Sequence, residues 1–313
     1  MVQQVWLHIG TPKSGTSSLQ KYLVDQNDAL KAQGLAYISP PGKSSANDLA
    51  IAINRDRPAL AELAATMNAE IESRPESIGL ISSEMFYGID PDKLMGLLPA
   101  LRTRPLNVLV YLRRQDRYIE AMFLQKTKNG RFRGTIEDYI KKFDGSGSDY
   151  QKMLEPWENA AGATLVPRVL ERDRLVQGNV VSDALAQMGL NADAVETADE
   201  VNVSPGYHRV QLLQAAAEVG LCDPRKLQRR LAAKFPQKSA ERAPIFDMHA
   251  RLSFLNAYQS GNQALRSRYF DDHNILFDES DLIKPEASTG IPAFTDAQIT
   301  EITRLLEVAK TLM

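Results

Sequence analysis

The sequence predicts an α/β fold in which a parallel sheet is covered by helices. Short apolar runs alternate with stretches of helical periodicity through the first half of the chain, the pattern of strand–helix–strand units. The run Leu106–Leu112 (LNVLVYL) is continuous and short, as expected of a strand buried on both faces. A loop that contains Gly10 and Gly15 joins the first apolar run to the first helical pattern.

The order of the elements follows from these patterns. We expect strands at Val5–Ile9, Leu35–Ser39, Ile78–Ser83, Leu106–Leu112 and Thr164–Leu170. Apolar residues recur at helical spacing over Leu19–Leu30, Leu60–Ile71, Leu94–Leu101 and Tyr118–Phe123. The polar stretch from Pro40 to Asn47 is predicted to be a loop. Pro167 has no backbone N–H to donate to a neighbouring strand. We therefore expect it in an edge strand or near the end of a strand.

The second half of the chain is predicted to be a mainly helical extension packed on the sheet. From Tyr207 onward the pattern is helical and interrupted by prolines, and a closing amphipathic helix is expected over Asp296–Leu312. No long linker separates this part, although Asp144–Ser148 is a glycine- and serine-containing connection. We therefore expect one domain over residues 1–313, with a nucleotide-binding core at 1–175 and the extension at 176–313.

Composition limits the class of protein. The 313 residues contain 43% hydrophobic and 24% charged residues, with a formal net charge of −2. This balance gives no sign of nucleic-acid binding. A single cysteine excludes an internal disulfide framework and a cysteine-cluster metal site. No signal peptide or membrane-length apolar stretch is found, so we expect a cytoplasmic protein without a membrane span; the oligomeric state is not predicted.

The glycine loop has the features of an anion-binding site. The segment from Gly10 to Ser18 reads GTPKSGTSS, between an apolar strand and a helix. A helix that starts after a glycine loop offers unpaired N–H groups and a partial positive charge to an anion. The spacing is that of the phosphate loop, G-x-x-x-x-G-K-S/T, and the sheet is therefore of P-loop type. Thr16 occupies the usual lysine position, however, and the lysine lies inside the loop at Lys13.

The segment PKSGTSSL, from Pro12 to Leu19, resembles the 5′-phosphosulfate loop of sulfotransferases that use 3′-phosphoadenosine 5′-phosphosulfate (PAPS). The resemblance implies sulfuryl transfer from PAPS without a required metal. It assigns Lys13 to the leaving oxygen and a cofactor-binding role to the loop, which comprises Lys13, Ser14, Gly15, Thr16, Ser17 and Ser18. Looser similarity extends over most of the chain, for example at Trp157 and at the stretch Arg168–Arg172.

Arg113 is the second candidate for PAPS binding. It follows the strand Leu106–Leu112 and matches the sulfotransferase arginine that binds the 3′-phosphate, a role suited to the bidentate guanidinium. The family places a serine eight residues later, where this chain has Ala121. The alternative is that Arg113 and Arg114 form ion pairs with Asp116 and Glu120 at the start of a helix.

Glu84 is the candidate general base. It follows the strand Ile78–Ser83, so it should lie at the same sheet edge as the glycine loop. Several carbohydrate sulfotransferases use a glutamate base, and by this resemblance Glu84 would take the proton of the acceptor. The alternative is that Glu84 caps the following turn or pairs with an arginine.

Two further groups have a structural and a functional interpretation. His8 lies inside the first strand and is expected to be a buried structural histidine. Four cationic residues would lie on one side of a predicted helix: Lys226, Arg229, Arg230 and Lys234. This side is either a solvated face or a surface that attracts an anionic acceptor or PAPS. We expect a small-molecule or glycan acceptor with a hydroxyl or amine, whose identity the sequence does not give.

Two other functions remain open from the sequence. One is a P-loop small-molecule kinase that uses ATP and magnesium, against which the displaced lysine argues. The other is a non-catalytic nucleotide-binding protein, which Ala121 favours.

Overall fold

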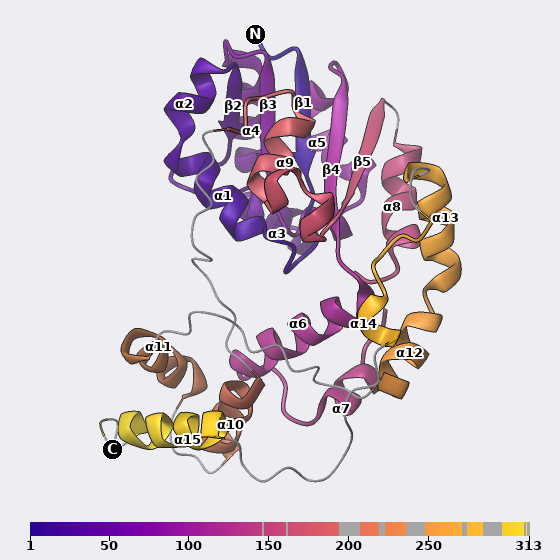
Figure 1. The fold of residues 1–313 in the computed structure, drawn as a ribbon. Helices are drawn as coiled ribbons and strands as arrows, with labels where there is room; N and C mark the ends of the chain where they lie inside the picture. The colour runs from indigo at the N-terminus through magenta and orange to yellow at the C-terminus, as the bar shows by residue number, and fades with distance from the viewer. Residues whose placement is uncertain are drawn as a thin grey trace. The chain divides into compact units, whose positions relative to one another are not determined.

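A computed structural model describes residues 1–145, 147–160, 162–193, 207–218, 223–235, 248–270, 274–283, 296–309 and 311. The chain divides into two compact units (Figure 1). The sheet unit comprises Met1–Arg114, Gly145–Ala198 and Tyr258–Asp278. The helical unit comprises Gln115–Asp144, Asp199–Ala257 and Glu279–Met313. The expected single-domain organisation, with its division at residue 175, stays a prediction. The single cysteine of the chain, Cys222, lies outside the described residues.

The predicted α/β fold is confirmed, because the sheet unit is built on five parallel strands in the order β2-β3-β1-β4-β5. Their bounds are β1 Gln4–His8, β2 Leu35–Ile38, β3 Ile78–Ser82, β4 Leu106–Leu112 and β5 Ala163–Val169. Each agrees with a predicted strand to within one or two residues. Pro167 lies in β5, which is an edge strand as its missing N–H required.

Helices cover both faces of the sheet (Figure 1). Successive side chains of a strand point to opposite faces, so Val5 and Leu7 of β1 join one buried cluster and Trp6 joins the other. The face with Trp6 packs against α1 Thr16–Asp25, α2 Asn27–Ala32 and α9 Val180–Gln187. The opposite face packs against α3 Asn47–Arg55, α4 Leu60–Ser73, α5 Pro91–Leu97, α8 Tyr150–Asn159 and α13 Gln259–Tyr269.

One local prediction needs correction, and one helix was not predicted. The first helical pattern, expected to continue to Leu30, is divided at Gln26 into α1 and α2. The polar segment after Pro40 is a loop as predicted, but it leads directly into α3, which the sequence analysis did not identify. Leu49, Ala50 and Ile53 form the buried face of α3. They are spaced as an amphipathic helix requires, and this spacing was the available signal.

The helical unit is described by itself. It contains α6 Gln115–Lys128, α7 Ile136–Lys141, α10 Tyr207–Glu218, α11 Pro224–Lys234, α12 Met248–Asn256, α14 Ser280–Ile283 and α15 Asp296–Ala309. Leu213, Leu227 and Leu305 bring α10, α11 and α15 into one apolar cluster, and Phe123 and Tyr139 bring α6 and α7 into another. Across the described parts of both units, no helix is long and apolar enough to cross a membrane.

A buried carboxylate connects α9 to the carboxyl ends of two strands. Asp183 in α9 is fully buried and accepts hydrogen bonds from Nε and Nη2 of Arg168 in β5, at 2.9 and 2.7 Å. The Tyr111 hydroxyl in β4 donates to the same carboxylate at 3.0 Å. The backbone N–H of Val176 adds a fourth bond at 3.2 Å. A buried charge is tolerated only when it is paired in this way.

A second buried polar group lies beneath the glycine loop. His8 is fully buried at the end of β1, and its Nδ1 lies 2.8 Å from the Ser82 hydroxyl at the end of β3. Gln20 of α1 donates to the same hydroxyl at 3.1 Å. Burial lowers the pKa of His8 from 6.5 to about 4, so the imidazole is neutral near pH 7. The expected structural role of His8 is thereby confirmed.

Replacing Asp183 with alanine should lower the free energy of unfolding by about 3 kcal/mol, because the Arg168 guanidinium loses its buried counter-ion and the Tyr111 hydroxyl loses one of its acceptors. Urea denaturation at pH 7 measures this change. Asp25→Ala is the matched control, since Asp25 forms an exposed ion pair with Lys21 and should cost no more than about 0.5 kcal/mol. A cost below about 1 kcal/mol for Asp183→Ala would show that the network does not hold the unit together.

The burial of His8 predicts a pH dependence of stability. Between pH 6.5 and about 4 the unfolded chain binds a proton at His8 and the folded chain does not. The free energy of unfolding should therefore fall by up to about 3 kcal/mol as the pH drops through this window, with no contribution from His8 above it. Urea denaturation across this range should give a flatter profile for His8→Asn. A folded-state NMR titration of His8 near pH 6.5 would contradict the prediction.

Candidate functional site

The candidate residues come from loops that follow three neighbouring strands. β1 lies between β3 and β4, and the register pairs His8 with Ser82 on one side and with Leu109 on the other. The loops that carry Lys13, Glu84 and Arg113 therefore leave the same edge of the sheet. In parallel sheets this is the edge at which ligands bind.

The glycine loop between β1 and α1 has an unusual backbone. Gly10, Lys13 and Gly15 have φ values of 106°, 65° and 82°, in the left-handed region. At Gly10 a Cβ atom would lie 2.8 Å from the backbone oxygen of Glu84, so this position needs glycine for space as well as for φ. Lys13 adopts a positive φ although it has a side chain, which is rare outside constrained sites.

Side chains fix the loop from inside and from β4. The Ser14 hydroxyl donates to the Thr11 carbonyl at 2.5 Å, and the Thr11 hydroxyl donates to the Tyr111 carbonyl at 3.1 Å. Nη1 of Arg113 donates to the Lys13 carbonyl at 3.0 Å. The structure thus brings Arg113 against the loop through the backbone of Lys13.

The N-terminus of α1 presents its first turn at the end of the loop. Gly15 is the N-cap and supplies no side-chain acceptor for the first amides. The backbone N–H groups of Ser18 and Leu19 donate to the Gly15 carbonyl, at 3.1 and 3.2 Å. Earlier amides of the turn precede the helical hydrogen-bond pattern, and the helix dipole adds partial positive charge there. Ser17 and Ser18 are exposed, whereas Thr16 is buried.

Glu84 lies against the start of the same helix. The Thr16 hydroxyl donates to Oε2 of Glu84 at 3.1 Å, which joins two residues that are distant in sequence. The turn that carries Glu84 is anchored at Ser83, whose backbone N–H donates to the His8 carbonyl at 3.0 Å and whose hydroxyl donates to Asn47 at 2.6 Å. The Glu84 carboxylate is half-buried and is bound by the first residue of α1; among the described residues it forms no ion pair with an arginine.

Tyr150 is a site neighbour that the sequence analysis missed. Its hydroxyl, at the start of α8, donates to the Arg113 carbonyl at 2.5 Å and accepts from the Arg113 N–H at 3.3 Å. Both backbone polar groups of Arg113 are therefore bound by one side chain. Asp149 before Tyr150 is an N-cap signal that could have located α8, but nothing local indicates the long-range bond.

The two arginines after β4 have different environments. Arg113 is half-buried, whereas Arg114 is buried and donates to the Asp278 carbonyl at 2.5 Å. Asp116, a partner of these arginines in the alternative interpretation, forms a buried ion pair with Arg251 at 2.8 Å. Ala121 lies in α6 of the helical unit.

The site joins cationic and hydroxyl groups with one carboxylate. Lys13, Arg113 and the start of α1 supply positive charge, and Thr16 connects the loop to Glu84. Such a site can bind an anionic group at the loop and offer a carboxylate beside it as a proton acceptor. Throughout the described residues, no group of three or more His, Cys, Asp or Glu side chains is placed to hold a metal ion.

Comparison with known proteins gives distant similarities. No family model matches the chain. It is 26% identical over 200 residues to an uncharacterized protein of Archaeoglobus fulgidus, and the match covers 62% of this chain. The chain spans about half, 54%, of the length of that relative.

Among solved structures, the chain is similar to a sulfotransferase from Alicyclobacillus acidocaldarius, with a TM-score of 0.45 and 16% identity over 87% of this chain and 98% of that one. It is also similar to a mouse sulfotransferase complexed with PAP, with a TM-score of 0.32 and 13% identity over 99% of this chain and 88% of that one.

Proposed function

We propose that this chain is a PAPS-dependent sulfotransferase that transfers a sulfuryl group to a hydroxyl or amine of a small molecule or glycan. One observation carries the proposal: the loop with the displaced Lys13 is bound to Glu84 through Thr16 and to Arg113 through the Lys13 carbonyl. The three residue types that sulfuryl transfer requires thus lie around one anion-binding loop. The fold alone, without these contacts of the loop, would not indicate which reaction the protein catalyses.

The loop fits a phosphosulfate group. Gly10 and Gly15 both have left-handed φ values and little room for a side chain, because Glu84 lies close to Gly10 and Val180 lies close to Gly15. The start of α1 contributes amides and a partial positive charge, and Ser17 and Ser18 add exposed hydroxyls. Lys13, Ser14, Gly15, Thr16, Ser17 and Ser18 would together hold the 5′-phosphosulfate.

PAPS would supply a sulfuryl group on a phosphate leaving group. Glu84 would accept the proton of the acceptor hydroxyl as its oxygen bonds to sulfur. The bond between sulfur and the 5′-phosphate oxygen would break, which gives a sulfate ester and 3′,5′-adenosine bisphosphate. Lys13 would stabilise the negative charge that develops on that leaving oxygen, where electrostatic stabilisation is most effective.

Arg113 would bind the 3′-phosphate while it supports the loop. Its guanidinium offers five N–H donors, of which Nη1 is directed at the Lys13 carbonyl. Tyr150 holds the backbone of Arg113 on both sides and so fixes where the side chain begins. Binding of PAPS and the conformation of the loop would thereby depend on the same arginine.

A kinase is the second candidate, and one contact favours it. The bond between Thr16 and Glu84 places a carboxylate beside a hydroxyl at the start of α1. A hydroxyl after the glycine loop and an acidic residue on a neighbouring strand are the groups that hold magnesium in P-loop enzymes. ATP with magnesium is therefore the ligand to test against the PAPS product.

Isothermal titration calorimetry separates these two functions. We expect 3′,5′-adenosine bisphosphate to bind without magnesium, and Lys13→Ala to lower PAPS-dependent transfer by about 10²–10³-fold through loss of leaving-group stabilisation. Lys21→Ala removes an exposed lysine and should retain full activity. Tight binding of ATP only with magnesium would support the kinase. Binding of the bisphosphate without transfer to any acceptor would support a non-catalytic protein.

Glu84→Gln tests the base. The amide oxygen of glutamine can still accept the Thr16 hydrogen bond but cannot take a proton, so transfer at saturating acceptor should fall by about 10²–10⁴-fold. Affinity for 3′,5′-adenosine bisphosphate, measured by calorimetry, should stay within about threefold of the unchanged protein, a shift below about 1 kcal/mol. Full turnover in Glu84→Gln would remove the base role, and a large loss of affinity would reassign Glu84 to positioning the loop.

A further inference from the structure

Two cationic segments of the helical unit form one surface. The first is the end of α6 with the following turn, and the second is α11. The Arg225 Nε at the start of α11 donates to the Asn129 carbonyl at 3.1 Å, which joins the two segments. We call this the basic surface; it consists of Lys126, Lys128, Arg131, Arg133, Arg225, Lys226, Arg229, Arg230 and Lys234.

Few salt bridges neutralise this surface within the described residues, although the carboxylate of Asp223 interacts with the charges of Arg225 and Lys226. Within the described residues, the only salt bridge that any of these nine side chains forms is the one between Lys234 and Glu307, at 3.2 Å. Neither 126–133 nor 225–234 contains an acidic residue. Arg229 and Arg230 are exposed and lie one turn from Lys226, an arrangement of like charges that destabilises a helix in the absence of an anion.

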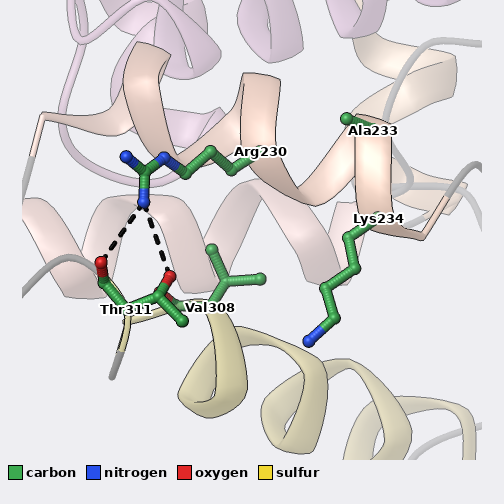
Figure 2. Close-up of a pocket in the computed structure, with 5 residues that line it drawn as sticks. All are labelled: Arg230, Ala233, Lys234, Val308 and Thr311. Atoms are coloured by element: carbon green, nitrogen blue, oxygen red, sulfur yellow. Dashed lines mark hydrogen bonds between the residues drawn. The ribbon is translucent and has the colours of Figure 1, made fainter.

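A cavity of about 380 Å³ opens beside this surface (Figure 2). Arg230 and Lys234 of α11 line it together with Thr311 and Val308. The Arg230 Nη1 contacts the carbonyl and the hydroxyl of Thr311 at 3.3 and 3.4 Å, distances at the long limit of a hydrogen bond. Within the described residues, Arg230 forms no salt bridge, whereas Lys234 is paired with Glu307. The unpaired charge at the cavity therefore comes from Arg230, and together with the Thr311 hydroxyl it suits an anionic group on a sugar ring.

The aromatic residues near the surface argue against a single-stranded nucleic acid, because base stacking requires accessible rings. Phe132 packs edge-on against Phe123 and Tyr139, with centroid distances of 5.9 and 5.0 Å. Phe235 lies under the cations of Lys234 and Arg304, at 5.3 and 5.2 Å.

We propose that the basic surface binds an acidic polysaccharide, with an anionic group of the polymer in the cavity at Arg230 and Lys234. Such a polymer carries many hydroxyls, so it would also be the acceptor of the proposed transfer. Only this last step rests on the proposed function. Binding of the polymer depends on the helical unit and not on PAPS or the glycine loop.

Binding of fluorescently labelled dextran sulfate, with neutral dextran of the same length as reference, tests the proposal on the full chain without nucleotide. We expect dextran sulfate to bind and neutral dextran not to bind. The triple change K226Q/R229Q/R230Q should weaken binding at least tenfold and reduce the slope of log affinity against log salt. The control K21Q/K43Q/K152Q removes the same charge from exposed lysines of the sheet unit and should leave binding within twofold.

The outcomes distinguish this surface from its alternatives. Equal losses in both triple variants, or no loss in either, would overturn the proposal, because binding would then not depend on this surface. Tighter binding of a 20-nucleotide oligothymidine at the same salt concentration would identify a nucleic-acid surface instead, and tighter binding of vesicles that contain anionic lipid would identify a membrane surface. Because no nucleotide is present, loss of transfer in Lys13→Ala has no bearing on these results.

Discussion

Two hydrogen bonds hold the glycine loop in the conformation on which the candidate site depends. Thr16 donates to Glu84 on one side, and Arg113 donates to the Lys13 carbonyl on the other. Left-handed φ values at three loop positions have a conformational cost that the surrounding structure must offset. Both supports reach the loop because β1 lies between β3 and β4, so that strand order determines which side chains can act together.

Buried polar groups keep these strand ends in place. Tyr111, two residues before Arg113, is bound to Asp183, and this carboxylate also binds Arg168 in the neighbouring strand. The first residue of α9, Val180, lies so close to Gly15 that an added Cβ would be 3.0 Å from its Cγ2 atom. The carboxylate therefore fixes both β4, which carries Arg113, and the helix that packs on the loop. A site built on such rigid elements has little reorganisation to make when an anion binds.

The sequence predicts the fold better than the contacts of the site. β1 to β4 could be found because parallel strands buried on both faces have a strong local signature, whereas the partly exposed edge strand β5 has a weaker one. The loop could be found from its glycine spacing. The bond between Tyr150 and Arg113 joins residues 37 positions apart, and that between Thr16 and Glu84 joins residues 68 positions apart. Such pairs arise from strand order and helix packing, which local patterns do not encode. The unusual position of Lys13 can be read from the sequence. The hydrogen bond that its backbone carbonyl accepts from Arg113 cannot.

The position of the lysine bears on which anion the loop suits. A lysine at position 16 would extend from the first turn of α1, beside the phosphates of a nucleoside triphosphate. Here Thr16 is buried and donates to Glu84, and the lysine lies in the middle of the loop, where its backbone carbonyl accepts from Arg113. Lys13, Arg113 and the start of α1 thus contribute positive charge to one loop, and Glu84 contributes a carboxylate. A phosphosulfate group carries fewer negative charges than a triphosphate, so Lys13 and the start of α1 would balance a larger share of its charge, and Arg113 would remain available for the 3′-phosphate.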